Sequence, residues 1–123
     1  RYENIRVELG DAYDGPRIQK DKNDRFVPKK NDPFYPSLLG LHIVKTIYID
    51  NDERGKASDI VFRNIHVRCA RTPTSHIAGF DEAHGFKGVR IENLRFNDQA
   101  SVTNASQMKL NVGKFVSDVK ILP

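Results

Sequence analysis

The feature that most constrains this chain is a short phrase that occurs more than once in the sequence. Residues 60–67 read IVFRNIHV and residues 89–96 read VRIENLRF. In both, apolar residues alternate with polar or charged ones, and an Asn precedes the last two apolar positions. Alternation with a period of two is typical of a β-strand with one buried face, and no helical periodicity accompanies it. The sequence therefore predicts an all-β fold.

The phrase returns at a nearly constant spacing, which predicts a repeat architecture. Asn64 and Asn93 lie 29 residues apart, and Gly88 and Asp118 lie 30 residues apart. Residues 2–7 (YENIRV) fit the same frame, and a partial copy begins at Asp118. A second apolar stretch follows each full copy, at residues 38–44, 76–80 and 108–112. A period of this size is typical of solenoids, whose repeats stack on one another.

A parallel solenoid places equivalent positions of successive repeats side by side, about 4.8 Å apart. Asn tolerates left-handed backbone, and its side chain bonds to nearby main chain. We therefore expect a structural ladder at a bend, formed by Asn4, Asn64 and Asn93. In the same frame two apolar columns are expected to stack inside, namely Tyr2, Phe62 and Ile91, and Ile5, Ile65 and Leu94. Regular strand spacing also allows an alternative, an antiparallel sandwich.

Residues 10–37 interrupt the repeat. The interval from Asn4 to Asn64 equals two periods, so either one repeat is eroded or a loop is inserted. The segment is rich in Gly, Pro, Asp, Asn and Lys, which favours an inserted loop. Loops of this length in a compact domain are commonly functional or disordered. The 123 residues are the size of one domain, so we interpret residues 1–123 as a single β-helix segment that carries this loop.

Two stretches carry a resemblance to a known family. The runs DIVFRNIHV (59–67) and SHIAGFDEAHGFKGVRIENLRF (75–96) resemble the carboxyl-terminal coils of right-handed parallel β-helix proteins. They are most similar to bacterial polygalacturonase-like glycoside hydrolases of the pectin-lyase-like superfamily, over residues 1–9 and 38–123. The resemblance implies a right-handed parallel β-helix of about three to four coils. It also implies a secreted or periplasmic parent enzyme that hydrolyses glycosidic bonds in pectin-type polysaccharide.

The family's catalytic motifs are not found in this sequence. It contains neither Asn-Thr-Asp nor Asp-Asp, and it matches the family's Gly-His-Gly and Arg-Ile-Lys only approximately, at residues 83–85 and 17–20. No catalytic residue is carried over. The resemblance thus implies a fragment whose catalytic coils lie upstream and which is inactive alone. The alternative is a noncatalytic carbohydrate-binding or adhesive β-helix module.

One turn contains candidate acid–base chemistry. Asp81, Glu82 and His84 place two carboxylates and an imidazole within four positions, from which a general acid and a base can be drawn. The alternative interpretation is a solvated turn, since turns collect such residues. The four histidines match no metal-binding spacing, and Cys69 is the only cysteine. The sequence therefore predicts no metal site, no cofactor and no internal disulfide.

Charge indicates the kind of partner. The net charge is +4, and residues 17–32 hold six basic side chains against three acidic ones. Cations and aromatic rings suit an acidic polysaccharide such as polygalacturonate. The candidate substrate-binding residues in the loop are Arg17, Lys20, Arg25 and Tyr35. The alternative is a solvated loop without a ligand.

Other partners are disfavoured by the same sequence. Lysines alternate with aspartates and no nucleic-acid motif is present, so nucleic acid is not expected as a partner. No apolar run of 18 residues occurs, so no membrane span is expected. An open coil edge leaves strand hydrogen-bonding groups unpaired, which predicts a capacity for end-to-end self-association.

Overall fold

Alternating apolar and polar residues form strands through most of the chain. The computed structural model describes residues 1–10, 16–20, 22–33, 36–45 and 53–123, with the backbone alone for 16–20 and 26–33. The strands are β1 (Tyr2–Leu9), β2 (Pro16–Lys20), β3 (Phe26–Pro33), β4 (Gly40–His42), β5 (Ala57–Cys69), β6 (Ser75–Ala78), β7 (Phe86–Phe96), β8 (Leu110–Val112) and β9 (Val116–Leu122). A short 3-10 helix, η2 (Ser106–Met108), precedes β8.

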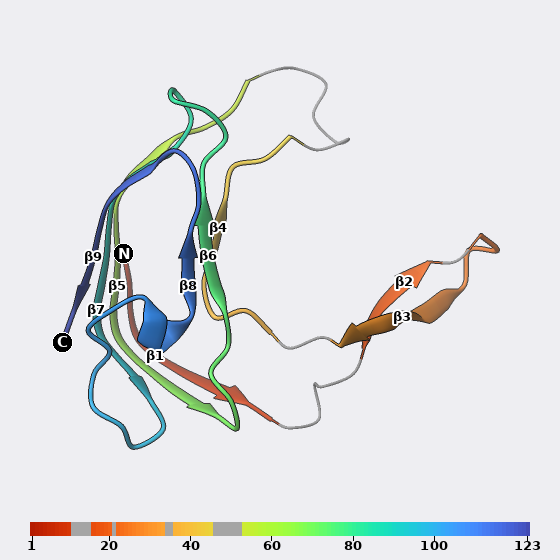
Figure 1. The fold of residues 1–123 in the computed structure, drawn as a ribbon, viewed down its shortest axis with the longest axis horizontal. Helices are drawn as coiled ribbons and strands as arrows, with labels where there is room; N and C mark the ends of the chain where they lie inside the picture. Colours follow the sequence, from red (N-terminus) through yellow and green to blue (C-terminus); the bar gives the residue numbers. More distant parts are fainter. Residues whose placement is uncertain (11–15, 21, 34–35, 46–52) are drawn as a thin grey trace.

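The strands form two parallel sheets and one hairpin. One sheet has the order β1-β5-β7-β9 and the other the order β4-β6-β8, with every neighbouring pair parallel. From β5 onward the chain alternates between the two sheets, which face each other in Figure 1. The all-β prediction is confirmed. The alternative of an antiparallel sandwich is wrong, because each return to a sheet follows a crossover through the other one.

The pairing register matches the repeat frame read from the sequence. Phe62 lies opposite Tyr2 on one side and Ile91 on the other, and Ile65 lies in the same way between Ile5 and Leu94. The second apolar stretches pair as well, because His76 lies opposite both Gly40 and Asn111. Equivalent positions of successive repeats are therefore neighbours in space, as the period predicted.

The long strands bend where one residue adopts left-handed backbone. Asn4, Asn64 and Asn93 have φ values of 58°, 54° and 50°. A second column, Asp59, Gly88 and Asp118, has φ values of 56°, 73° and 55°. Asn, Asp and Gly are the residues that accept this conformation at low cost. The first bend was predicted, whereas the second was not identified from the sequence.

The predicted Asn ladder exists, but its bonds differ from the expectation. Nδ2 of Asn64 donates to Oδ1 of Asn4 at 3.0 Å, and Nδ2 of Asn93 donates to Oδ1 of Asn64 at 3.0 Å. The hydroxyl of Ser101 donates to Oδ1 of Asn93 at 2.8 Å. The amides therefore bond to one another rather than to main chain, because stacked repeats bring identical side chains together.

The core lies between the two parallel sheets. Five of its side chains have no exposed surface, namely Val67, Ile77, Val89, Ile91 and Met108. Tyr2 and Ile5, predicted to be interior, are 55% and 37% exposed. Their strand β1 lies at the end of its sheet, so only one neighbouring strand covers them. Tyr2 still stacks on Phe62, with 5.1 Å between ring centroids.

The segment 10–37, interpreted as an inserted loop, contains regular structure. Strands β2 and β3 within it pair antiparallel, with Lys20 opposite Phe26. Figure 1 draws this hairpin away from the two parallel sheets. Within the described residues, none of the helical structure is long and apolar enough to cross a membrane.

Candidate functional site

Two of the three candidate catalytic residues are occupied in building their own turn. Oδ1 of Asp81 accepts hydrogen bonds from the main-chain N–H groups of Ala83 and His84, at 3.0 and 2.8 Å. The same oxygen lies 2.6 Å from Nδ1 of His84. The two residues also form an isolated antiparallel bridge. The Asp81–His84 pair therefore closes the turn, which agrees with the structural interpretation of this motif.

The electrostatics of Asp81 fit this structural role. Desolvation alone raises its pKa, but the hydrogen bonds from His84 and Ala83 together outweigh that effect and lower the pKa below its usual value. A carboxylic acid with a lowered pKa is ionised near neutral pH and holds no proton to donate. Asp81 is thus unsuited to act as a general acid.

Replacing Asp81 by Asn tests the turn through its pH dependence. A carboxyl group whose folded pKa is lowered stabilises the protein above its unfolded pKa, about 3.9, and loses that contribution as pH falls through the folded value. We therefore expect Asp81→Asn to have a lower free energy of unfolding than the wild type in urea denaturation at pH 7. This difference in stability should become smaller at pH 3. A gap that stays constant between these pH values would contradict the ionic role of Asp81.

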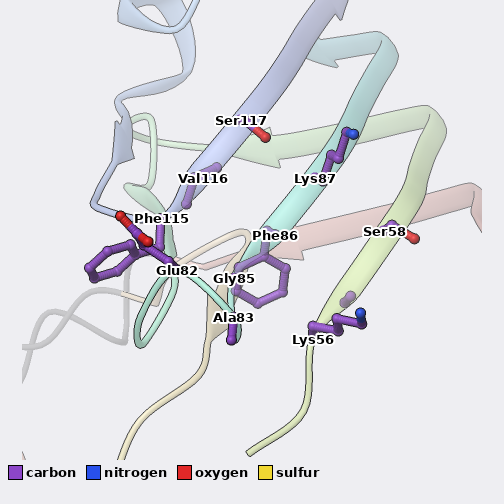
Figure 2. A pocket seen from close by; sticks show the side chains of 11 residues that line it. Lys56, Ser58, Glu82, Ala83, Gly85, Phe86, Lys87, Phe115, Val116 and Ser117 are labelled. Atoms are coloured by element: carbon purple, nitrogen blue, oxygen red, sulfur yellow. The ribbon is translucent and has the colours of Figure 1, made fainter.

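The third candidate, Glu82, borders a pocket of about 670 Å³ (Figure 2). The pocket lies where β5, β7 and β9 begin, next to the turn that Asp81 and His84 close. Its lining consists of Lys56, Ala57, Ser58, Glu82, Ala83, Gly85, Phe86, Lys87, Phe115, Val116 and Ser117. The structure thus separates the three candidates: Glu82 contributes to the pocket, whereas Asp81 and His84 hold the turn beside it.

The repeat frame arranges the pocket residues in rows. Ser58, Lys87 and Ser117 are direct neighbours across β5, β7 and β9, and Figure 2 shows their side chains projecting from these three strands. The preceding row, Ala57, Phe86 and Val116, points to the opposite side of the sheet, and Phe86 is buried. Lys56 lies just before β5. A cation thus stands between two hydroxyl groups, with a second cation in the same lining.

An aromatic side chain completes the lining. Phe115 is 41% exposed, and its φ of 60° is uncommon for a bulky residue. Its carbonyl oxygen accepts a hydrogen bond from the N–H of Phe86 at 3.0 Å. A Cβ added at Gly85 would overlap with that oxygen, and one added at Gly79 would lie 2.8 Å from the Phe115 Cβ. The two glycines therefore let the Phe115 backbone approach closely and set the position of its ring.

The described residues that line the pocket carry more positive than negative charge. Among the described residues that line it, Lys56 and Lys87 are the cations and Glu82 is the one carboxylate. All three side chains belong to exposed residues, so they can meet a ligand without first leaving a buried partner. An anionic or polyhydroxylated ligand suits this combination of cations, hydroxyls and an aromatic ring.

The sequence candidates in the inserted segment are not tested by the structure. Arg17 and Lys20 belong to β2, whose side chains are outside the described part, and Tyr35 lies wholly outside the described residues. Arg25 is exposed in the turn between β2 and β3. Their proposed substrate contacts therefore remain predictions.

Sequence reasoning missed most of the pocket. A signal was present, since aligning Asp59, Gly88 and Asp118 also aligns the residues just before them, Ser58, Lys87 and Ser117. These positions are polar, and their alternation predicts that they point outward. The contribution of Phe115 had no such signal, because it depends on the close approach of Gly79 and Gly85.

Two further reactive groups have structural roles. Glu92 lies 2.5 Å from Nε of Arg63 and 2.5 Å from a terminal nitrogen of Arg90, and the hydrogen bond from Arg63 is the main cause of its lowered pKa. Cys69 is half-buried, and this desolvation raises the pKa of its thiol. Glu92 is thus held as a carboxylate and Cys69 as a thiol, as expected for a small apolar filler.

Comparison with protein-family models, with curated proteins and with solved structures finds no match for this chain.

Proposed function

We propose that the chain forms a right-handed parallel β-helix of about three to four coils and is the carboxyl-terminal portion of a secreted or periplasmic polygalacturonase-like glycoside hydrolase. Three features support the β-helix: parallel pairing in both sheets, the chain's alternation between them, and the Asn ladder. The family assignment depends on the resemblance of residues 59–67 and 75–96. In this proposal the pocket binds the enzyme's acidic polysaccharide.

The observation that carries the binding proposal is the chemistry of the pocket lining. Lys56 and Lys87 match the carboxylates of a uronic-acid chain, and Ser58 and Ser117 match sugar hydroxyls. The exposed ring of Phe115 offers an apolar face to the sugar ring. Sugar sites combine an apolar surface with a few placed polar groups in this way.

Hydrolysis requires more than this lining provides. Glycosidases of either stereochemistry place two carboxyl groups around the scissile bond. Among the described pocket residues, Glu82 is the one carboxylate. In our proposal the second carboxylate comes from catalytic coils outside residues 1–123, and the chain alone binds without cleaving. The same observation favours a second candidate function, a noncatalytic carbohydrate-binding or adhesive module.

Binding of polygalacturonate by the purified chain tests the proposal. We expect measurable binding by isothermal titration calorimetry, weakened about fivefold or more by Lys87→Ala and further by the Lys56→Ala/Lys87→Ala double variant. The matched control is Arg68→Ala, which removes one positive charge at the far end of β5, where Arg68 is exposed and makes a long 3.9 Å ion pair with Asp98. Circular dichroism checks that each variant is folded.

Three outcomes discriminate between the candidates. If Arg68→Ala and Lys87→Ala weaken polygalacturonate binding equally, the effect comes from net charge alone. That result would contradict a defined binding site. Release of reducing sugars by the chain alone would contradict binding without cleavage and direct attention to Glu82. Release only when the chain is joined to the proposed catalytic coils would support the hydrolase over the noncatalytic module.

A further inference from the structure

Two imidazoles that are distant in sequence come together on the three-stranded sheet. The β4–β6 register places Gly40 opposite His76, and His42 lies two residues further along β4 on the same face. The ring centroids of His42 and His76 are 6.2 Å apart, with 33° between the ring planes. Neither ring belongs to the pocket, whose lining comes from the other sheet and the adjoining turns.

Gly40 has no side chain, which leaves room for the His42 ring next to it. A Cβ added at Gly40 would lie 3.8 Å from Nε2 of His42, so the His42 ring edge lies beside the residue that faces His76. On the next strand, Nδ2 of Asn111 lies 3.5 Å from Nδ1 of His76. Gly40, His76 and Asn111 thus form one row across β4, β6 and β8, and the His42 ring lies beside the Gly40 end of that row.

We propose that His42 and His76 together bind a divalent transition-metal ion. An imidazole nitrogen lies about 2.0–2.1 Å from a bound Zn²⁺, and the ring centre lies roughly 1.1 Å beyond it, so two rings that share an ion have centres at most about 6.4 Å apart. The separation of 6.2 Å falls within this limit. His42 is exposed, so rotation of its side chain can shorten the distance and bend the ligand angle towards a tetrahedral value.

Asn111 serves as a positioning residue for His76. Nδ2 of Asn111 faces Nδ1 of His76, and in this proposal the carboxamide rotates by half a turn when the metal binds, so that Oδ1 accepts the Nδ1–H of His76. That bond fixes the tautomer in which Nε2 carries the free lone pair, the usual arrangement of a metal-binding imidazole. Water fills the other coordination positions.

The ligand set selects the class of ion. Imidazole suits Zn²⁺, Ni²⁺ and Cu²⁺, whereas Ca²⁺ and Mg²⁺ require oxygen ligands. Within the described residues no group of three or more His, Cys, Asp or Glu side chains surrounds a common point. The proposed site is therefore a two-imidazole site completed by water, and its affinity depends on both rings at once.

Titration of the chain with Ni²⁺ tests the site. At pH 7.5 we expect one ion per chain by isothermal titration calorimetry, with affinity reduced at least about tenfold by His42→Ala or His76→Ala and about tenfold by Asn111→Ala. Paramagnetic broadening of amide resonances around His76 gives a second readout that locates the ion.

The matched control is His66→Ala. His66 lies on the other parallel sheet, where its Nε2 is 2.7 Å from the carbonyl oxygen of Asn97. Its replacement should leave Ni²⁺ affinity unchanged. His76→Gln, with circular dichroism, separates loss of a ligand from loss of folding. The proposal is overturned by an absence of Ni²⁺ binding, by binding that survives His42→Ala and His76→Ala, or by equal losses in His66→Ala.

Discussion

Replacing Gly85 by Ala is expected to destabilise the protein by about 1–3 kcal/mol and to displace the aromatic side of the pocket. The new Cβ would overlap with the carbonyl oxygen of Phe115, so one of the two backbone segments must move. Movement would lengthen the bond from the Phe86 N–H to the same oxygen, now 3.0 Å. One methyl group would therefore disturb the start of β7 and the position of Phe115 together.

The matched control for this prediction is Gly55→Ala. A Cβ at Gly55 meets no atom within 4 Å, so the substitution mainly restricts the unfolded chain. Its free energy of unfolding should equal that of the wild type or exceed it slightly. Both variants are measured by urea denaturation, and polygalacturonate binding should weaken in Gly85→Ala only. Equal stability of Gly85→Ala and Gly55→Ala would show that the contact with Phe115 is not tight in solution.

The sequence predicted the parts of the fold that repeat. The position of Asn64 relative to Asn93 set the frame, and the pairing of Phe62 with Ile91 and of Ile65 with Leu94 follows from it. A periodic chain carries this information several times, so errors in one copy are corrected by the others. For the same reason the inward-facing positions of β5 and β7 could be identified without any structure.

The features that the sequence did not predict are those that occur once or depend on contacts through space. The hairpin of β2 and β3 has no second copy to reveal its frame. Phe115 reaches the pocket because Gly79 and Gly85 lack side chains, and both contacts are distant in sequence. The spacing of His42 and His76 in the sequence does not indicate that they are neighbours, and the β4–β6 pairing brings them together.

Residue type alone predicted part of the candidate site. The turn around Asp81 was recognised because it gathers ionisable residues, but turns gather such residues when they are merely solvated. Hydrogen bonds in the structure distinguish a structural role from a role in the pocket. Oδ1 of Asp81 accepts hydrogen bonds from main-chain N–H groups of its own turn, whereas Glu82 lines the pocket. Residue type therefore located the region, and only geometry assigned the roles.

Replacing Asn64 by Ala is expected to lower the free energy of unfolding by about 2–5 kcal/mol, because it combines two losses at one bend. The variant removes both side-chain hydrogen bonds of the central ladder residue, each 3.0 Å long and each contributing roughly 0.5–1.5 kcal/mol. It also places Ala at a φ of 54°, where an ordinary side chain costs roughly 1–2 kcal/mol. Asn93 is left without its acceptor and Asn4 without its donor.

Asn64→Gly separates the two losses, because Gly accepts left-handed backbone freely and removes only the ladder. We expect Asn64→Gly to lie between the wild type and Asn64→Ala in urea denaturation. Gly also increases the freedom of the unfolded chain, so the measured loss is an upper limit for the ladder bonds. Wild-type stability in Asn64→Gly would mean that Asn occupies the bend for its backbone conformation alone. The hydrogen-bonded column would then be a consequence of parallel stacking rather than one of its causes.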